Sequence, residues 1–252
     1  MKFHLCQNAM QKTLNCHTEI FTLKIRTFLS RRLGKTMNKK LSIHLLLIIN
    51  CAVLYGVSYE WLDIPLLTCI HKNLVLSNSN LFEFCLRLGK ILTPSRIMLL
   101  TVVAIVLTNL YLRNKQNYKS LINKLWVALA SVLFCGGIVF VLKCLLARYR
   151  PIMFLEHGLY GFHFLSLKHS INSTPSGHAA IGMCVAYAFR NLISKTTFIS
   201  LLILAVLMCI SRVIAIQHYA SDVILGGYIG IYAVILVEAL ISLSLFKVSV
   251  EK

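Results

Sequence analysis

The sequence predicts an all-α protein, a polytopic membrane bundle of six transmembrane helices. Hydrophobic residues make up 58% of its 252 residues, and the mean hydropathy of +0.75 lies far above that of soluble globular domains. Six apolar stretches are each close to the ~20 residues that cross a bilayer core. They cover 41–59, 97–112, 125–146, 175–193, 198–217 and 223–246.

The charge of the chain is strongly basic. It contains 26 Lys and Arg against 8 Asp and Glu, which gives a net charge of +18. The basic residues fall between the apolar stretches and do not gather on one soluble module, which argues against a nucleic-acid partner. Their positions are those expected of topology signals, which place basic residues on the cytoplasmic side, and of residues that attract acidic lipid headgroups.

The N-terminal segment, residues 1–40, is polar and basic. It has no apolar core and no small-residue cleavage site, so it is unlike a secretory signal. Met37 is followed by Asn-Lys-Lys and then by the first apolar stretch, as in many inner-membrane chains. Residues 1–36 are therefore expected either to be a disordered extension or to lie upstream of the true start.

Alternation of the spans places the basic clusters on one side of the membrane, and we expect this side to be the cytoplasm. The clusters are the N-terminal segment, Arg113 to Lys124, Arg190 with Lys195, and Lys247. Both termini, including a short tail at 247–252, are then cytoplasmic. The opposite side receives the segment 60–95, the loop 147–174 and the turn around His218.

The segment 60–95 mixes charged and apolar residues at helical spacing, so it is expected to lie along the membrane interface. The nine cysteines of the chain show no metal-ligand spacing, and most lie in apolar stretches, where they pack as small hydrophobes. The sequence leaves open whether Cys69 and Cys85, both in this segment, form a disulfide.

The first polar cluster closes the third span, where Lys143 and Arg150 precede Pro151. Seven residues at ~100° each bring the two cations within ~20° of one another if the helix continues. Two cations on one face can grip one anion. Arg148, between them, is expected to lie at the membrane interface.

The second cluster is Pro175-Ser176-Gly177-His178, at the start of the fourth span. Thr174 is expected to be the N-cap and Pro175 the first helical residue. The amide groups of Ser176 and Gly177 are then free to bind an anion, because a helix N-terminus is an anion site.

The third cluster joins the fifth and sixth spans and contains Arg212, His218 and Asp222. The spacing of four residues lets Asp222 accept the Nδ1–H of His218 and leaves Nε2 unprotonated. Arg212 and His218 are ~120° apart on a straight helix. Either the helix breaks near Gln217 or the long Arg212 side chain reaches around.

These residue types suit phosphoryl transfer. The three cations of the clusters can neutralise phosphoryl oxygens as Mg²⁺ does elsewhere, so no metal or other cofactor is expected. His218, oriented by Asp222, is suited to attack phosphorus and form a phosphohistidine. His178 is suited to protonate the leaving oxygen and then to activate water, the second substrate.

The three clusters resemble the motifs of the type 2 phosphatidic acid phosphatase family, K-x6-R-P, P-S-G-H and S-R-x5-H-x3-D. Every spacing is met between residues 143 and 222. The resemblance implies a six-span phosphatase domain over 41–246. It implies catalytic roles for His218, His178 and Asp222, and phosphate-binding roles for Lys143, Arg150, Ser176, Gly177 and Arg212.

The resemblance further implies a lipid phosphatase that hydrolyses a phosphomonoester or pyrophosphate headgroup at the periplasmic face of a bacterial inner membrane. The run Gly158-x-Tyr160-Gly161-Phe162 is similar to the bacterial lipid A phosphatases, and its rings are expected to pack against lipid or sugar. Undecaprenyl pyrophosphate and phosphatidylglycerophosphate are alternative substrates. The oligomeric state is not indicated by the sequence.

A non-catalytic protein that binds or transports a lipid phosphate is the alternative of another class. The His218–Asp222 pair argues against it, because binding alone needs only the cations. Two other features have ordinary interpretations. Glu238 in the sixth span is expected to be held by a hydrogen bond within the bundle, and the small-residue pattern at Gly226 to Gly230 is expected to allow close helix packing.

Overall fold

The computed structural model describes Ser42 and residues 44–77 and 79–250, with side chains given up to residue 242 apart from His169. The chain divides into two compact units, Met1–Asn50 and Cys51–Lys252. The described residues of the first unit are helical. The predicted extension at 1–36 lies outside the described residues.

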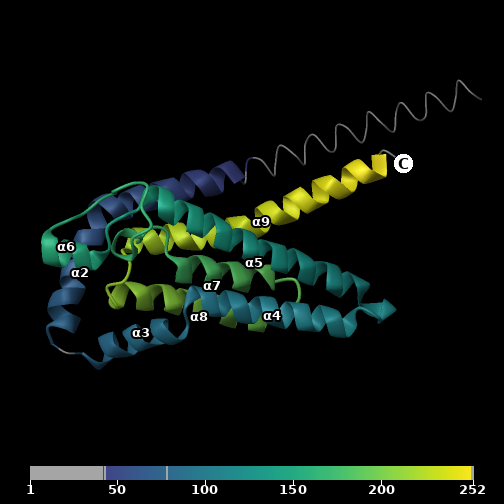
Figure 1. Ribbon diagram of the computed structural model, residues 1–252, viewed down its shortest axis with the longest axis horizontal. Helices are drawn as coiled ribbons and strands as arrows, with labels where there is room; N and C mark the ends of the chain where they lie inside the picture. The colour runs from purple at the N-terminus through teal and green to yellow at the C-terminus, as the bar shows by residue number, and fades with distance from the viewer. Residues whose placement is uncertain (1–41, 43, 78, 251–252) are drawn as a thin grey trace, which may run out of the picture. The chain divides into compact units, whose positions relative to one another are not determined.

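Almost all of the second unit is helical (Figure 1). The helices are α2 (Asp63–Ile70), α3 (Asn80–Ile91), α4 (Pro94–Leu112), α5 (Lys119–Leu146), α6 (Pro151–His157), α7 (Gly177–Ala188), α8 (Lys195–Ile214) and α9 (Ala220–Val250), with π-helical turns at Ser58–Leu62 and His71–Val75 and 3₁₀ turns at Gln116–Tyr118 and His169–Ile171. Over the described residues the only extended pairing is a single bridge between Arg148 and Phe162. The predicted all-α class is confirmed for this part of the chain.

Five helices are long and apolar enough to cross a membrane: His44–Val75, Pro94–Leu112, Gln116–Leu146, Lys195–Ile214 and Ala220–Ser242. The chain is thus an integral membrane protein. The remaining predicted span, 175–193, is shorter in the structure, because α7 has only 12 residues. At 1.5 Å per residue α7 is about 18 Å long, less than the ~30 Å of a bilayer core. The count of six spans and the cytoplasmic termini stay predictions.

The first apolar helix does not end at residue 59 as expected but continues to Val75. Asp63, Leu67 and Ile70 of α2 are buried, and the apolar pair packs with Ile216 and Tyr219 of the turn before α9. The charged residues that suggested an interfacial segment therefore include one that faces the interior. A second helix, α3, completes the segment 60–95.

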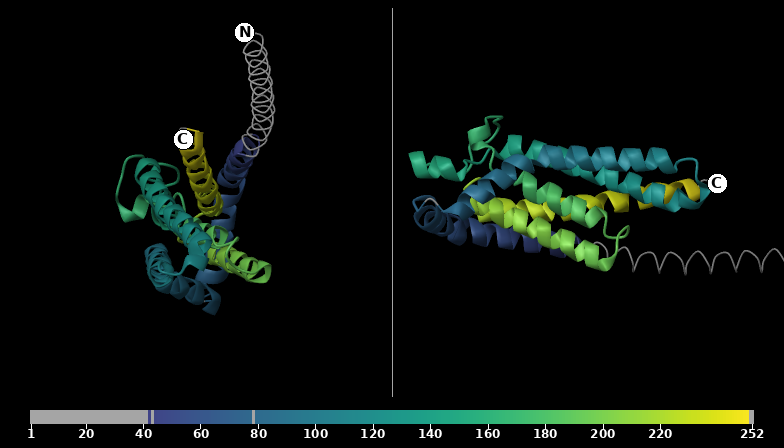
Figure 2. Two further views of the ribbon diagram at one scale, coloured as in Figure 1. Left: turned by 90° about the vertical axis from the view of Figure 1, so that its right-hand side faces the viewer. Right: turned by 90° about the horizontal axis from the view of Figure 1, so that it is seen from below.

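Helix α7 is packed among α5, α8 and α9 in the centre of the unit (Figures 1 and 2). Small residues allow the close approach: a Cβ on Gly226 would lie 2.5 Å from the carbonyl oxygen of Ser176, and one on Gly230 would lie 2.2 Å from that of Ala180. The expected close packing at Gly226 to Gly230 is confirmed. The contact fixes the start of α7 against the start of α9, and both ends carry predicted site residues.

The described cysteines are free thiols, including Cys69 and Cys85. Cys135 and Cys184 are fully buried in the apolar cluster of α5, α7 and α9. At these two positions the interpretation of cysteine as a packing residue is confirmed.

Candidate active site

Six of the eight predicted site residues line one cavity of about 330 Å³. They are Lys143, Arg150, Gly177, His178, Arg212 and His218. The other two, Ser176 and Asp222, are fully buried behind the cavity wall. The three motifs thus converge in space, although they come from three different helix ends.

The first motif reaches the cavity by a route that the helical model did not predict. Helix α5 ends at Leu146, and Ala147 has a left-handed backbone with φ of 42°. The expectation that Arg150 shares a helix face with Lys143 was therefore wrong. Arg150 instead lies in an extended conformation directly before Pro151, as residues before proline tend to do.

Both cations of this motif already have acceptors. Lys143 Nζ donates to the carbonyl oxygen of Asn172 at 2.6 Å, and Arg150 Nη1 donates to Gln217 Oε1 at 3.2 Å. Burial lowers the pKa of the Arg150 guanidinium, and the nearby Asp222 carboxylate opposes this change. The two side chains thus bring positive charge into a partly desolvated cavity, where it acts strongly on an anion.

The second motif differs from the prediction at its cap. Helix α7 begins at Gly177, and its N-cap is Ser176, not Thr174. The amide of Ser176 donates to the carbonyl oxygen of Asp222 at 2.9 Å, so it is not available to a phosphate. The Thr174 hydroxyl instead donates to Asp222 Oδ1. This motif serves the buried carboxylate as well as the cavity.

The third motif is divided by a helix break. Helix α8 ends at Ile214, two residues after Arg212, and Ile216 in the following turn has φ of 53°. Of the two options that the sequence left open, the break is the one observed. Because of this break, His218 lines the cavity together with Arg212.

The predicted hydrogen bond between His218 and Asp222 is not formed at hydrogen-bond length. Their Nδ1 and Oδ2 atoms are 3.8 Å apart, beyond the usual range. Asp222 Oδ2 instead accepts from the Ser173 hydroxyl at 2.6 Å and from the Tyr219 amide at 2.9 Å. The carboxylate faces the imidazole as a nearby charge that is fixed by other donors.

The imidazole of His218 is electrically neutral near pH 7. Its pKa is lowered to about 3, mainly by burial and in part by Lys143 and Arg150, while Asp222 opposes the change. A neutral imidazole keeps a lone pair, which a nucleophile requires.

Helix α3 forms a wall of the cavity, which sequence reasoning missed. The guanidinium of Arg212 donates to the carbonyl oxygen of Cys85 and lies directly over Gly89. His178 Nε2 is 3.3 Å from the carbonyl oxygen of Gly89, and since a carbonyl only accepts, this nitrogen carries the proton. The helical spacing within 60–95 predicted an interfacial segment but did not indicate that part of it covers the cavity.

An apolar groove of about 590 Å³ lies on another side of α3. Leu81, Phe84, Cys85, Leu88 and Leu92 come from α3 and the residues directly after it, and Ile97 of α4 together with mostly apolar residues of α7 and α8 completes the lining. The same helix thus borders a cationic cavity and an apolar groove.

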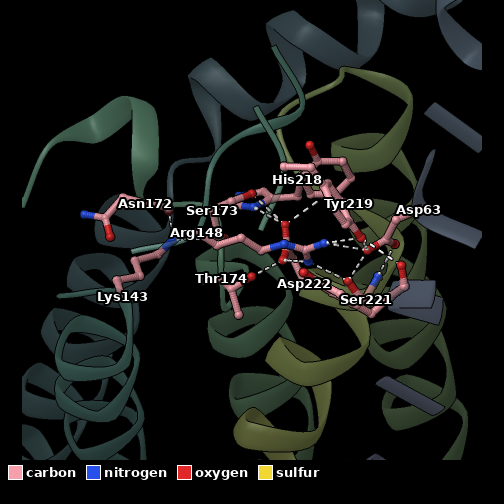
Figure 3. Close-up of polar contacts among 12 residues, drawn as sticks. Asp63, Lys143, Arg148, Asn172, Ser173, Thr174, His218, Tyr219, Ser221 and Asp222 are labelled. Atoms are coloured by element: carbon pink, nitrogen blue, oxygen red, sulfur yellow. Dashed lines mark hydrogen bonds and ion pairs between the residues drawn. The ribbon is translucent and has the colours of Figure 1, made fainter. Parts of the chain in front are cut away.

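Arg148 is the largest departure from the prediction. It was expected at the membrane interface, but its side chain is fully buried and pairs with Asp222 at 2.6 Å and with Asp63 of α2 at 2.8 Å (Figure 3). Burial by itself lowers the pKa of Arg148, but the two carboxylates hold it above its ordinary value. Two loop residues expected to face lipid, Tyr160 and Phe162, lie against the guanidinium, with ring centroids 5.1 and 5.8 Å from Cζ.

Residues 124–244 match the family model described as the PAP2 superfamily. This segment resembles the PAP2 superfamily. The predicted resemblance is confirmed, and the matched PAP2 segment contains all three motifs, from Lys143 to Asp222.

Two curated proteins match part of this chain. Both are named lipid A 1-phosphatase, from Rhizobium johnstonii and Rhizobium etli, and each is 31% identical over 96 residues. The matches cover 38% of this chain and 39% and 41% of the relatives. The chain therefore spans about two-fifths of the length of the curated relatives that it matches.

Two solved structures are also similar. The crystal structure of Aquifex aeolicus LpxE is 19% identical with a TM-score of 0.48, covering 72% of this chain and 98% of that one. A PAP2-type phosphatidylglycerolphosphate phosphatase from Bacillus subtilis is 20% identical with a TM-score of 0.37, covering 77% and 95%.

Proposed function

We propose that this protein is a membrane lipid phosphatase that works through a phosphohistidine. The observation that carries the proposal is the cavity in which two histidines, His178 and His218, meet the three cations Lys143, Arg150 and Arg212. Three positive charges match the equatorial oxygens of a phosphoryl group, and stabilising these oxygens is most of what phosphoryl transfer needs.

The reaction proceeds in two steps. In the first, the neutral imidazole of His218 attacks phosphorus and the bond from phosphorus to the lipid oxygen breaks. His178, which enters this step as an imidazolium, gives its Nε2 proton to that oxygen and becomes neutral. In the second, His178 takes a proton from water, the oxygen of which attacks the phosphohistidine. Inorganic phosphate leaves, and both imidazoles return to their starting states.

The apolar groove supports a lipid substrate. It lies against α3, and α3 also borders the phosphate cavity. A headgroup phosphate among the cations and an acyl chain along the groove would bury charge and hydrocarbon in matching surroundings. A soluble phosphate ester would leave the groove without an occupant.

Among lipid substrates we favour a lipid A phosphate, at the periplasmic face of a bacterial inner membrane. The two curated relatives named lipid A 1-phosphatase support this choice of substrate. The distribution of basic residues supports the orientation, because the predicted cytoplasmic side lies opposite the motifs.

Release of inorganic phosphate tests the proposal. Purified protein is assayed with lipid A, undecaprenyl pyrophosphate, phosphatidylglycerophosphate and phosphatidic acid, beside the variant His218→Ala. We expect release that is fastest with lipid A and lost in the variant, with an acid-labile phosphoprotein trapped only in the unaltered protein. Binding of the lipids without any release would favour the non-catalytic alternative, and full release by His218→Ala would exclude this nucleophile.

A further inference from the structure

The guanidinium of Arg148 bridges two buried carboxylates (Figure 3). Ser221 closes the arrangement. Its hydroxyl accepts from Arg148 Nη1 at 2.6 Å and donates to Asp63 Oδ2, and its amide donates to Asp63 Oδ1 at 3.0 Å. Each charge has several partners, as buried charges require. The network joins α2 to the start of α9, which carries Asp222.

Four aromatic rings enclose the guanidinium. The ring centroids of Tyr59, Tyr160, Phe162 and Tyr219 lie 4.3 to 5.8 Å from its Cζ. The Tyr160 hydroxyl accepts from Nη2 at 2.8 Å. Packed rings exclude water and attract a cation, so the guanidinium has little freedom to leave the two carboxylates.

The network stands behind the cavity and not in it. Neither Arg148 nor Asp63 lines the space that holds the three cations, and both side chains are inaccessible to solvent. Their route to the chemistry is through Asp222, which Arg148 contacts on Oδ1 while Oδ2 faces His218. A change at Asp63 therefore reaches the imidazole without touching a phosphate contact.

We propose that Asp63 and Arg148 are positioning residues for the proposed reaction, holding the Asp222 carboxylate toward Nδ1 of His218 so that Nε2 is presented to phosphorus. This inference rests on the proposed function. The cations proposed to bind phosphate are held independently of this network, because Lys143 donates to Asn172 and Arg212 donates to Cys85. Loss of the network should therefore slow the attack and leave the affinity for phosphate unchanged.

The variant Asp63→Asn tests the proposal, because it removes one charge and keeps the shape. We expect kcat to fall about 10- to 100-fold, by analogy with the loss of a partner that orients a metal-binding histidine. The KM for lipid substrate and the inhibition constant of inorganic phosphate should stay the same. Formation of the phosphoprotein, followed by rapid quench, should slow by the same factor as kcat. Glu60→Gln is the matched control, since Glu60 is a solvent-exposed carboxylate three residues away, and it should behave as the unaltered protein.

A milder variant decides the question if Asp63→Asn does not fold. Tyr160→Phe removes only the hydroxyl that accepts from Arg148, and it should lower kcat in the same way but less. Unchanged kcat in folded Asp63→Asn, or a rise in KM at constant kcat, would overturn the positioning role. Absence of phosphate release by the unaltered protein would instead overturn the proposed function, and this inference with it.

Discussion

Gly89 offers a direct test of the contact between α3 and the cavity. A Cβ at this position would lie 1.3 Å from Arg212 Nη1 and 2.0 Å from its Cζ, far inside any real contact. The clashing atoms are the end of a flexible side chain, so Gly89→Ala should still fold. The guanidinium must leave its place, and the cavity then loses one of its three cations.

The size of the effect follows from the lost contact. A hydrogen bond to a charged group contributes about 1.5–3 kcal/mol, so kcat/KM for a lipid phosphate should fall about 10- to 150-fold at 1.4 kcal/mol per factor of ten. The inhibition constant of inorganic phosphate should rise, because phosphate loses the same contact. The double variant Gly89→Ala with Arg212→Ala should be no slower than Arg212→Ala alone, because both changes remove the same contact.

Gly137→Ala is the matched control for this experiment. Gly137 is also a helical glycine, but a Cβ there meets nothing within 4 Å. Its activity should be that of the unaltered protein. If Gly89→Ala kept full kcat/KM, Arg212 would not be a phosphate ligand in the position seen here, and the proposed grip by three cations would be wrong.

Three further predictions follow from other contacts. Because His218 is neutral when folded, with a pKa of about 3, and titrates near 6.5 when unfolded, its contribution to stability is complete above pH 6.5 and is lost as pH falls toward 3. The thermal midpoint of the unaltered protein should therefore drop between pH 6.5 and 4, and that of His218→Gln should drop less steeply. The same pH dependence of the midpoint in both proteins would refute this. Glu238 pairs with Arg190 at 2.6 Å, so Glu238→Gln should cost up to about 1 kcal/mol of stability and leave kcat unchanged; a tenfold loss of turnover would indicate a proton relay. Gly230→Val should lower the free energy of unfolding by about 1–3 kcal/mol or more, and the thermal midpoint with it, since the Cβ would meet the backbone oxygen of Ala180. An unchanged midpoint would show that α9 can move away from α7.

The residues of the cavity were predictable because their chemistry is unusual at their positions. A lysine, arginines and histidines at apolar helix ends carry a desolvation cost that only a partner or a ligand offsets. Residues 143, 150, 178, 212 and 218 were all found in this way. The backbone conformations that bring these residues to the cavity were not predictable, because helix ends depend on local geometry such as the left-handed conformation of Ala147.

The pair Asp63 and Arg148 could not be predicted by the same reasoning. The two residues lie in segments far apart in sequence, and each by itself has the ordinary interpretation of a charge near a membrane surface. Only the packing of α2 against the turn before α9 brings them together. The one available signal was the carboxylate of Asp63 on the otherwise apolar helix α2. This signal does not indicate which residue pairs with the carboxylate.

Three side chains of the cavity already have hydrogen-bond acceptors within the protein. Lys143, Arg212 and His178 contact the backbone carbonyl oxygens of Asn172, Cys85 and Gly89. In the proposed reaction, an arriving phosphate therefore replaces carbonyl oxygens that these side chains already contact. Binding is then an exchange of acceptors, and its gain comes from the greater charge of phosphate. Release of the product reverses the exchange, and the protein itself supplies the competing ligands that limit how tightly its own product can bind.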